Sequence, residues 1–178
     1  PLIAPGRINS LSQTLLKLTC PGIPDFYQGC ELWDLSLVDP DNRLPVDFAA
    51  RRALLEEVTK MSCTEVLARS DEGLPKLFLA TRALQVRQER RPAFEDDYAA
   101  LWADGDHADH VIAHRRGTDV IAVGQRWPVT RGEMWSDTTL PLPDGTWRDV
   151  LSDETHQGRI AMADLLAPFP VSLLVAER

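Results

Sequence analysis

Carboxylates and aromatic rings are concentrated in one segment of the chain, residues 21–48, which reads PGIPDFYQGCELWDLSLVDPDNRLPVDF. Its acidic residues are Asp25, Glu31, Asp34, Asp39, Asp41 and Asp47, and among them stand Phe26, Tyr27, Trp33 and Arg43. Aromatic rings stack on the apolar faces of sugars, and carboxylates accept hydrogen bonds from hydroxyl groups. This combination of side chains therefore indicates a site for a polyhydroxyl ligand.

Two other interpretations of this segment stay open. Asp and Asn are common turn formers, and the run DPDN at residues 39–42 is good turn chemistry without any ligand. Alternatively, Asp25 and Glu31 form a catalytic pair. Retaining glycoside chemistry needs two carboxyl groups about 5 Å apart, a distance that spacing along the chain does not show.

The elements around this segment are those of an α/β protein. Residues 8–19 carry leucines at helical spacing, with Asn9 or Ser10 as the expected N-cap. The next apolar run, residues 22–28 (GIPDFYQ), predicts a short buried strand bounded by breakers. Because ligands bind at the carboxyl ends of strands in barrels and open α/β sheets, the long loop at residues 29–47 is expected to lie at a binding edge.

The rest of the chain divides into helical and β-type sequence. Residues 48–60 and 74–89 are predicted amphipathic helices, with a short helix between them that ends at Gly73. After Pro92 the chain consists of short alternating or β-branched runs separated by turn signals, which is typical of a β-sandwich. We therefore expect α/β material at residues 1–97 and an all-β, antiparallel sandwich domain at residues 98–178.

Composition excludes several function classes. The chain has 178 residues and a net charge of −8. This charge and the lack of a basic stripe argue against nucleic acid and against an anionic membrane surface as partners. No apolar run approaches the ~20 residues that span a bilayer. Three cysteines without CxxC spacing, and no secretion signal, favour reduced thiols in a cytoplasmic protein. The start PLIAPGRINS, without an initiator Met, suggests a cut through a longer protein.

Histidines and tryptophans in the second half invite further hypotheses. The spacing of His107, His110 and His114 would suit a metal site on a helix, but HVIAHRR alternates like a strand, so we expect no metal. The nearby aspartates lack the calcium-loop pattern. The four tryptophans beside predicted strands are expected mainly in the sandwich core, with one or two free to stack on glucan. They are Trp102, Trp127, Trp135 and Trp147.

Several stretches together resemble the maltooligosyl trehalose synthase family of the alpha-amylase superfamily. The loose pattern YQGxE at residues 27–31 is shared by many amylase relatives, whereas ELWDLSLVDPDNR at residues 31–43 is specific to the synthases. GRINSLSQTLLKLTCPG, LATRALQVRQERRPAFEDDY and ADHVIAHRR are similar to the same family. The resemblance is strong over residues 7–48 and runs through most of the chain.

The resemblance implies a fold, a reaction and a set of partners. Residues 1–97 would hold the terminal strand and helices of a TIM (β/α)8 barrel, followed by the antiparallel β-sandwich. The family changes the reducing-end α-1,4 link of a maltooligosaccharide into an α,α-1,1 trehalose link within one molecule, as an isomerase without a cofactor. Its catalytic carboxylates follow earlier barrel strands, so this chain would carry no catalytic residue and be inactive alone. Its expected partners are the maltooligosaccharide substrate, the upstream barrel and the trehalose-releasing hydrolase of the pathway.

Eight residues are expected to bind substrate when the resemblance is carried over by position. They are Tyr27, Gln28, Glu31, Trp33, Asp39, Asp41, Asn42 and Arg43. One departure is Leu44, where the family usually has Arg. Two other function classes stay open: an α-glucan hydrolase of the same superfamily, and a non-catalytic module whose β-domain binds glucan or docks a partner enzyme.

Overall fold

The computed structural model of the chain describes residues 2–132 and 134–177. Its helices are α1 (Ile3–Thr19), α2 (Phe48–Val58), α3 (Cys63–Ala68), α4 (Leu74–Glu89), α5 (Arg91–Glu95), α6 (Pro128–Arg131) and α7 (Met162–Leu165), with 3-10 turns η1 (Asp41–Arg43), η2 (Ser70–Glu72) and η3 (Ala108–His110). Its strands are β1 (Tyr98–Leu101), β2 (Val111–Arg116), β3 (Val120–Gln125), β4 (Thr139–Pro141), β5 (Trp147–Asp149), β6 (Thr155–His156), β7 (Arg159–Ala161) and β8 (Ser172–Ala176).

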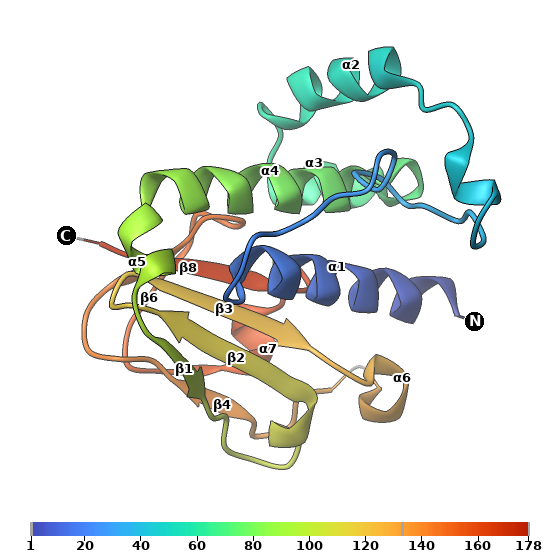
Figure 1. Ribbon diagram of the computed structural model, residues 1–178. Coiled ribbons are helices and arrows are strands. Elements are labelled where there is room, and N and C mark those ends of the chain that lie inside the picture. The colour runs from blue at the N-terminus through green and yellow to red at the C-terminus, as the bar shows by residue number, and fades with distance from the viewer. Residues whose placement is uncertain (1, 133, 178) are drawn as a thin grey trace.

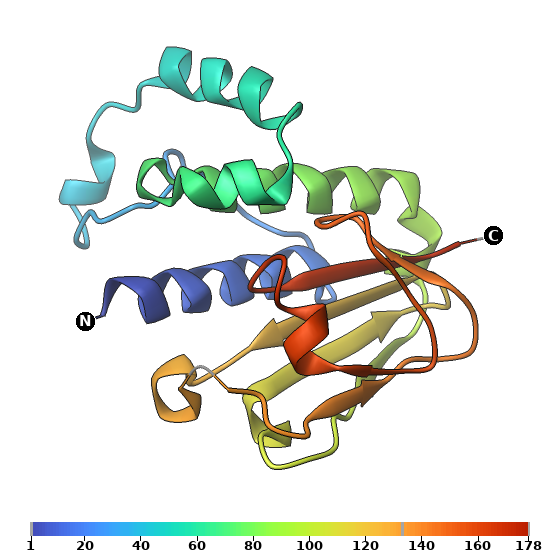
Figure 2. The same ribbon diagram turned by 180° about the vertical axis from the view of Figure 1, so that it is seen from behind.

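The strands form antiparallel sheets, as the sequence predicts. Six of them pair in the order β1-β2-β3-β8-β5-β6, and β4 pairs with β7 as a separate ribbon. The described residues form no full sandwich of two comparable sheets. Instead, α1 and α4 cover one face of the large sheet, and α2 lies on the far side of α4 from the sheet (Figures 1 and 2).

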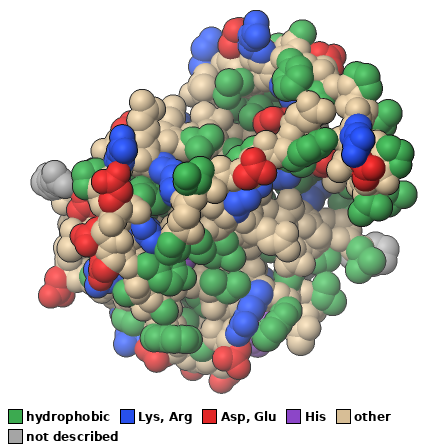
Figure 3. Space-filling view, in the orientation of Figure 1, with side chains coloured by type: hydrophobic (Ala, Val, Ile, Leu, Met, Phe, Trp, Pro, Cys, Tyr) green, Lys and Arg blue, Asp and Glu red, His purple; other side chains and the backbone are tan. Residues whose placement is uncertain are grey.

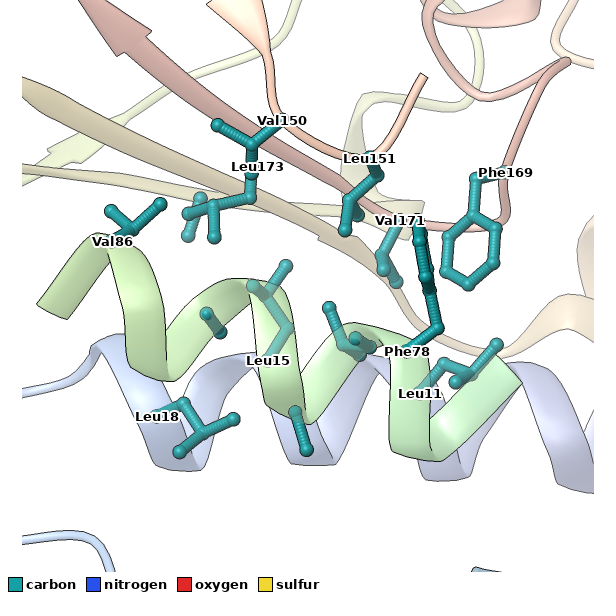
Figure 4. Close-up of a cluster of buried hydrophobic side chains, with 14 of the residues drawn as sticks. Leu11, Leu15, Leu18, Phe78, Val86, Val150, Leu151, Phe169, Val171 and Leu173 are labelled. Atoms are coloured by element: carbon teal, nitrogen blue, oxygen red, sulfur yellow. The ribbon is translucent and has the colours of Figure 1, made fainter. Parts of the chain in front are cut away.

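A single hydrophobic core joins the helical segment to the sheet. Leu15 and Leu18 of α1, Leu79 of α4 and Leu173 of β8 are fully buried in it, and the close-up shows Val86 of α4 pointing towards Leu173 (Figure 4). Burying each such side chain contributes about 1.5–3 kcal/mol relative to exposure. The change from helices to strands falls at Tyr98, while this core spans both sides of it.

A second core fills the other face of the sheet. Ile121, Val123 and Leu174 of β3 and β8 pack there with Met162 and Leu165 of α7. Alternation along the strands explains the two cores, because neighbouring residues such as Ile121 and Ala122 point to opposite faces. The sheet is therefore buried on both sides over β3 and β8.

Helix α4 confirms its predicted bounds, and Gly73 shows why it starts there. Gly73 has φ +81°, and a Cβ atom on it would lie 2.9 Å from the backbone nitrogen of Trp33. Only glycine fits that conformation and that space. Just upstream, Ser62 and Glu65 form a capping box that begins α3.

Two local predictions are wrong. Helix α1 begins at Ile3 rather than near residue 8, and neither Asn9 nor Ser10 caps it. Proline is tolerated in a first helical turn because its missing N–H would be unpaired there, so Pro5 does not stop the helix. In addition, residues 23–27 form no strand, and Ile23 is 96% exposed. The described residues of this segment have no ladder partner; Ile23 stays uncovered, whereas Phe26 is half-buried against the core, with the Lys17 ammonium 3.9 Å from its ring centroid.

No helix among the described residues is long and apolar enough to cross a membrane.

Candidate functional site

The acid-rich loop forms a hollow together with the start of α2. Residues 20–47 leave the end of α1, pass beside α4 and reach α2 through the turn η1 (Figure 1). The hollow has a volume of about 350 Å³. It is lined by Gln28, Gly29, Trp33, Asp34, Ser36, Asp41, Asn42, Leu44, Pro45, Val46, Asp47 and Arg51.

Four of the eight predicted substrate-binding residues line this hollow: Gln28, Trp33, Asp41 and Asn42. The carboxylate of Asp41 accepts a hydrogen bond of 2.7 Å from the backbone N–H of Leu37, so it shapes the loop as well as facing the hollow. The side-chain Oδ1 of Asn42 is buried and has no hydrogen-bond partner in the part of the chain that the structure describes. A buried acceptor without a donor is costly, so Asn42 is suited to accept from a ligand hydroxyl.

The other four predicted residues lie outside the hollow. Glu31 forms an ion pair with Arg51, at 3.1 Å between Oε2 and Nε, and Asp39 pairs with Arg43 four residues on. Tyr27 is 45% exposed. Glu31 is thus paired with Arg51, and Asp25 is exposed, so this arrangement does not favour Asp25 and Glu31 as a catalytic pair of carboxylates.

Trp33 forms one wall of the hollow, and contacts with other segments of the chain hold its ring in place. Its indole N–H donates a 2.6 Å hydrogen bond to the carbonyl oxygen of Ser70. The Arg7 guanidinium lies 5.8 Å from its ring centroid and pairs with Asp71 at 2.6 Å. These contacts fix the ring plane, which a sugar-stacking surface requires.

Asp34 also lines the hollow, although it is not one of the eight predicted substrate-binding residues. It accepts a 2.9 Å hydrogen bond from the backbone N–H of Ser36, and the Cys30 thiol donates to it at 3.3 Å. Hydrogen bonds from Ser36 lower the pKa of Asp34, whereas burial and then Asp34 itself raise the pKa of Cys30. Asp34 is therefore an ionised acceptor, and Cys30 is a neutral donor.

Arg51, Ser36 and Asp47 also line the hollow without having been predicted. In the sequence, Arg51 is simply one charged residue of a predicted amphipathic helix. Its contact with Gly29 spans 22 residues, so no local pattern indicates it. Asp47 had a local signal, because it precedes a predicted helix. The structure confirms it as the N-cap of α2, accepting from the backbone N–H of Ala50 at 2.9 Å.

The histidines and tryptophans take different places in the β segment. His114 is buried, and the rings of His107 and His110 meet edge to face with centroids 5.5 Å apart. Among the described residues, no three His, Cys, Asp or Glu side chains are grouped to hold a metal ion. Trp135 and Trp147 are buried in the second core, whereas Trp102 and Trp127 are 80% and 54% exposed.

The loop also leaves apolar side chains on the surface. Leu35, Leu37 and Val38 are each more than three-quarters exposed. In the space-filling view, hydrophobic side chains mix with charged ones where the loop lies in Figure 1 (Figure 3). A protein surface seldom leaves such a row uncovered without a binding role.

These features define the chain as a layer of helices on an antiparallel sheet, with a polar loop hollow suited to hydroxyl-rich ligands. No model of a known protein family matches the chain. It is 42% identical over 171 residues to a protein of Mycobacterium tuberculosis (strain H37Rv) that is provisionally named maltooligosyl trehalose synthase, covering 95% of this chain and 20% of that protein. The chain thus spans about a fifth of the length of this curated relative.

Solved structures give the same result. Maltooligosyltrehalose synthase from Arthrobacter ramosus superposes with a TM-score of 0.89 at 39% identity, covering 99% of this chain and 23% of that one. A second maltooligosyl trehalose synthase gives a TM-score of 0.77 at 30% identity, covering 97% and 22%. The chain is therefore homologous to the C-terminal region of maltooligosyl trehalose synthases.

Proposed function

We propose that this chain is the C-terminal region of a (1→4)-α-D-glucan 1-α-D-glucosylmutase, an isomerase that forms the trehalose end of a maltooligosaccharide. The homology to maltooligosyl trehalose synthases over 95% of the chain is the observation that carries the proposal. In this proposal residues 2–97 close a (β/α)8 barrel in a cytoplasmic enzyme, and residues 98–177 form its β-domain. The exposed Ile23, Leu35 and Val38 then pack against the rest of the barrel.

The chain's own residues would bind and orient the sugar rather than break its bond. The ionised Asp34 and the buried Oδ1 of Asn42 are acceptors for sugar hydroxyls, and the fixed ring of Trp33 offers a stacking wall. A mutase must pass the glucosyl group to the sugar just released instead of to water. Holding that sugar and excluding water are positioning tasks that a loop over the barrel mouth performs.

The carboxylates that cleave the bond belong elsewhere in this proposal. Glu31 and Asp39 are in ion pairs, and Asp41 and Asp47 accept backbone hydrogen bonds. Such groups are committed to the loop's shape. The isolated chain is therefore expected to be inactive.

The test is a paired assay of the complete enzyme and the isolated 178-residue chain on maltohexaose, measuring reducing ends and free glucose together. We expect the complete enzyme to consume reducing ends with little glucose released, and the isolated chain to do nothing. Release of glucose or short oligosaccharides in step with new reducing ends would identify a hydrolase. Activity of the isolated chain would contradict the placement of the catalytic groups outside it.

One observation favours a second candidate, a glucan-binding role for the β-domain. Trp102 stands 80% exposed beside a hollow of about 260 Å³ that Tyr98, Asp109 and Arg126 help to line. Hydrophobic side chains gather on this face, where β1 and β2 lie (Figure 3). If this surface binds glucan, amylose in an affinity gel should retard the Trp102→Ala variant less than it retards the wild type. Trp127→Ala serves as the comparison. Equal mobility of wild type and Trp102→Ala in those gels would remove this candidate.

A further inference from the structure

The loop at residues 29–47 has a first limb that begins at Gly29 and a second limb that ends at Asp47. The two limbs meet at a narrow neck, where Gly29 lies against Val46 and Arg51. Gly29 on the first limb has φ +89°, and a Cβ atom there would lie 3.3 Å from Cγ2 of Val46 on the second limb and 3.6 Å from Nη2 of Arg51. The positive φ favours glycine, and the short Cβ distances leave little room for a side chain. The neck thus lies where the loop enters and leaves the hollow.

Arg51 ties this neck together from the first turn of α2. Its Nη2 donates to the carbonyl oxygen of Gly29 at 3.1 Å, and its Nη1 donates to the carbonyl oxygen of Asp47 at 3.2 Å. Its Nε donates to Glu31 at 3.1 Å. One guanidinium therefore bridges both ends of the loop, and its side chain is only 22% exposed.

The chemistry of the contact is specific to arginine. A planar guanidinium presents its donors in a fixed fork, whereas a lysine ammonium is a single charge on a flexible stem. Lysine at this position would keep the attraction to Glu31 and lose the simultaneous contact with both carbonyl oxygens. The contact with the carbonyl oxygen of Gly29, 22 residues away, joins the two limbs, whereas the contact with Asp47 orients the guanidinium within its own limb.

The hollow depends on this closure because its lining comes from both limbs. Asp34 and Ser36 lie on the first limb, and Asp41 and Asn42 lie on the second. When the neck opens, these acceptors separate and water enters between them. An error of about 1 Å in such a site costs up to ~100-fold in rate.

We propose that Arg51 is a positioning residue that holds the loop closed and thereby sets how much of the glucosyl group goes to the released sugar and how much to water. This inference rests on the proposed function. Arg51 touches the loop and not the reacting atoms, so its substitution should change partition between the two outcomes more than it changes substrate consumption.

The experiment compares four forms of the complete enzyme on maltohexaose: wild type, Arg51→Ala, Arg51→Lys and Arg52→Ala. Arg52 is exposed on the same helix and is the matched control. We expect the ratio of glucose released to trehalose-terminated product to rise roughly tenfold in both Arg51 variants and to stay unchanged in Arg52→Ala. Gly29→Ala opens the same neck from the other limb and should raise the ratio as well, which keeps the test decisive if one variant folds poorly.

Hydrogen exchange of peptides within residues 29–47 is the second measurement. We expect loss of protection in both Arg51 variants and not in Arg52→Ala. An unchanged product ratio with normal substrate consumption would overturn the inference, as would unchanged exchange in the loop. If the wild-type enzyme itself releases glucose as its main product, the proposed function fails and the partition role with it, while the exchange data still decide whether Arg51 closes the neck.

Discussion

Two buried groups should give the stability of this protein opposing responses to acid. Asp149 on β5 is 1% exposed and accepts hydrogen bonds from the backbone N–H groups of Leu151 at 2.8 Å and Leu173 at 3.4 Å. Burial, with a smaller contribution from Glu154, raises the pKa of Asp149 from 3.8 to about 6, although the backbone hydrogen bonds oppose the shift. The folded state therefore holds the proton more tightly than the unfolded state does.

The direction in which pH changes the contribution of Asp149 to stability follows from this difference in proton affinity. Its contribution to stability is fully present below pH 4 and is lost as the pH rises through about 6. The difference between a pKa of 3.8 in the unfolded state and about 6 in the folded state corresponds to about 3 kcal/mol of stability. Acidification from pH 7 towards pH 4 thus stabilises the fold through this group.

His114 on β2 acts in the opposite direction. Burial lowers the pKa of His114 from 6.5 to about 4; the Thr19 backbone opposes this shift, and the positive charge of Arg116 adds a smaller lowering effect. The ring also packs on Tyr98, with centroids 4.9 Å apart. Its contribution is present above pH 6.5 and is lost as the pH falls through about 4, again about 3 kcal/mol over the whole range.

The perturbation is Asp149→Asn, measured by denaturant unfolding at pH 7, 6, 5 and 4. Asparagine keeps an acceptor for the two backbone N–H groups and removes the titration. We expect the wild type to change little over this range, because the two contributions nearly cancel. Asp149→Asn should lose about 3 kcal/mol between pH 7 and pH 4, since only His114 then titrates strongly.

Asp144→Asn is the control, because Asp144 is exposed in the turn before β5. It should reproduce the wild-type profile. The reasoning is refuted if Asp149→Asn keeps the flat profile of the wild type, or if both variants lose stability equally.

Two further predictions concern backbone and capping. Gly73→Ala should cost about 1–3 kcal/mol, because an L residue at φ +81° is strained and its Cβ would press on the backbone of Trp33; Gly6→Ala, where a Cβ atom has open space, should be neutral or mildly stabilising in the same unfolding assay. Ser62→Ala removes the capping box of α3 and should cost about 1 kcal/mol of unfolding free energy. Threonine at this position should restore most of that loss, and an undiminished stability of Ser62→Ala would contradict the capping role.

Local sequence patterns correctly predicted those elements that depend on neighbouring residues in the chain. The bounds of α4 follow from Gly73 and from its leucine spacing, and the antiparallel pairing of β2 with β3 follows from alternating runs around a turn. The predicted strand at residues 22–28 failed for a physical reason: an apolar run shows only that a surface needs covering. Among the described residues no strand pairs with this run, and Ile23 is exposed.

The candidate site was likewise predicted in part: some lining residues were expected from the sequence, and others were missed. Trp33, Asp41 and Asn42 were predicted from residue type and from the family resemblance, and they do face one hollow. Arg51 was missed because its meaning depends on a contact with Gly29 across 22 residues, which no local pattern encodes. Similarly, nothing in the sequence distinguishes the buried Trp147 from the exposed Trp102, because both stand beside predicted strands.

The loop is held at three points, and this frame explains how an irregular segment can keep a defined shape. Arg87 of α4 donates to the carbonyl oxygens of Leu18 and Gly22, at 2.9 Å and 2.5 Å, and so fixes the start of the loop to the end of α1. Arg51 closes the neck. Lys76 of α4 donates to the carbonyl oxygen of Leu32 at 3.2 Å, beneath the hollow. Each anchor is a cationic side chain that donates to a backbone carbonyl oxygen, and Arg51 also pairs with the Glu31 carboxylate.

The helices that anchor the loop belong to the core that joins the helical and β segments. The two arginines and Lys76 that hold the loop project from α2 and α4, and α4 is in turn fixed by packing on α1 and the sheet. A loop positioned in this way inherits the rigidity of the sheet, although it makes no ladder of its own. Variation in the exposed apolar residues of the loop should therefore alter what it contacts, whereas variation in its three cationic anchors should alter its shape.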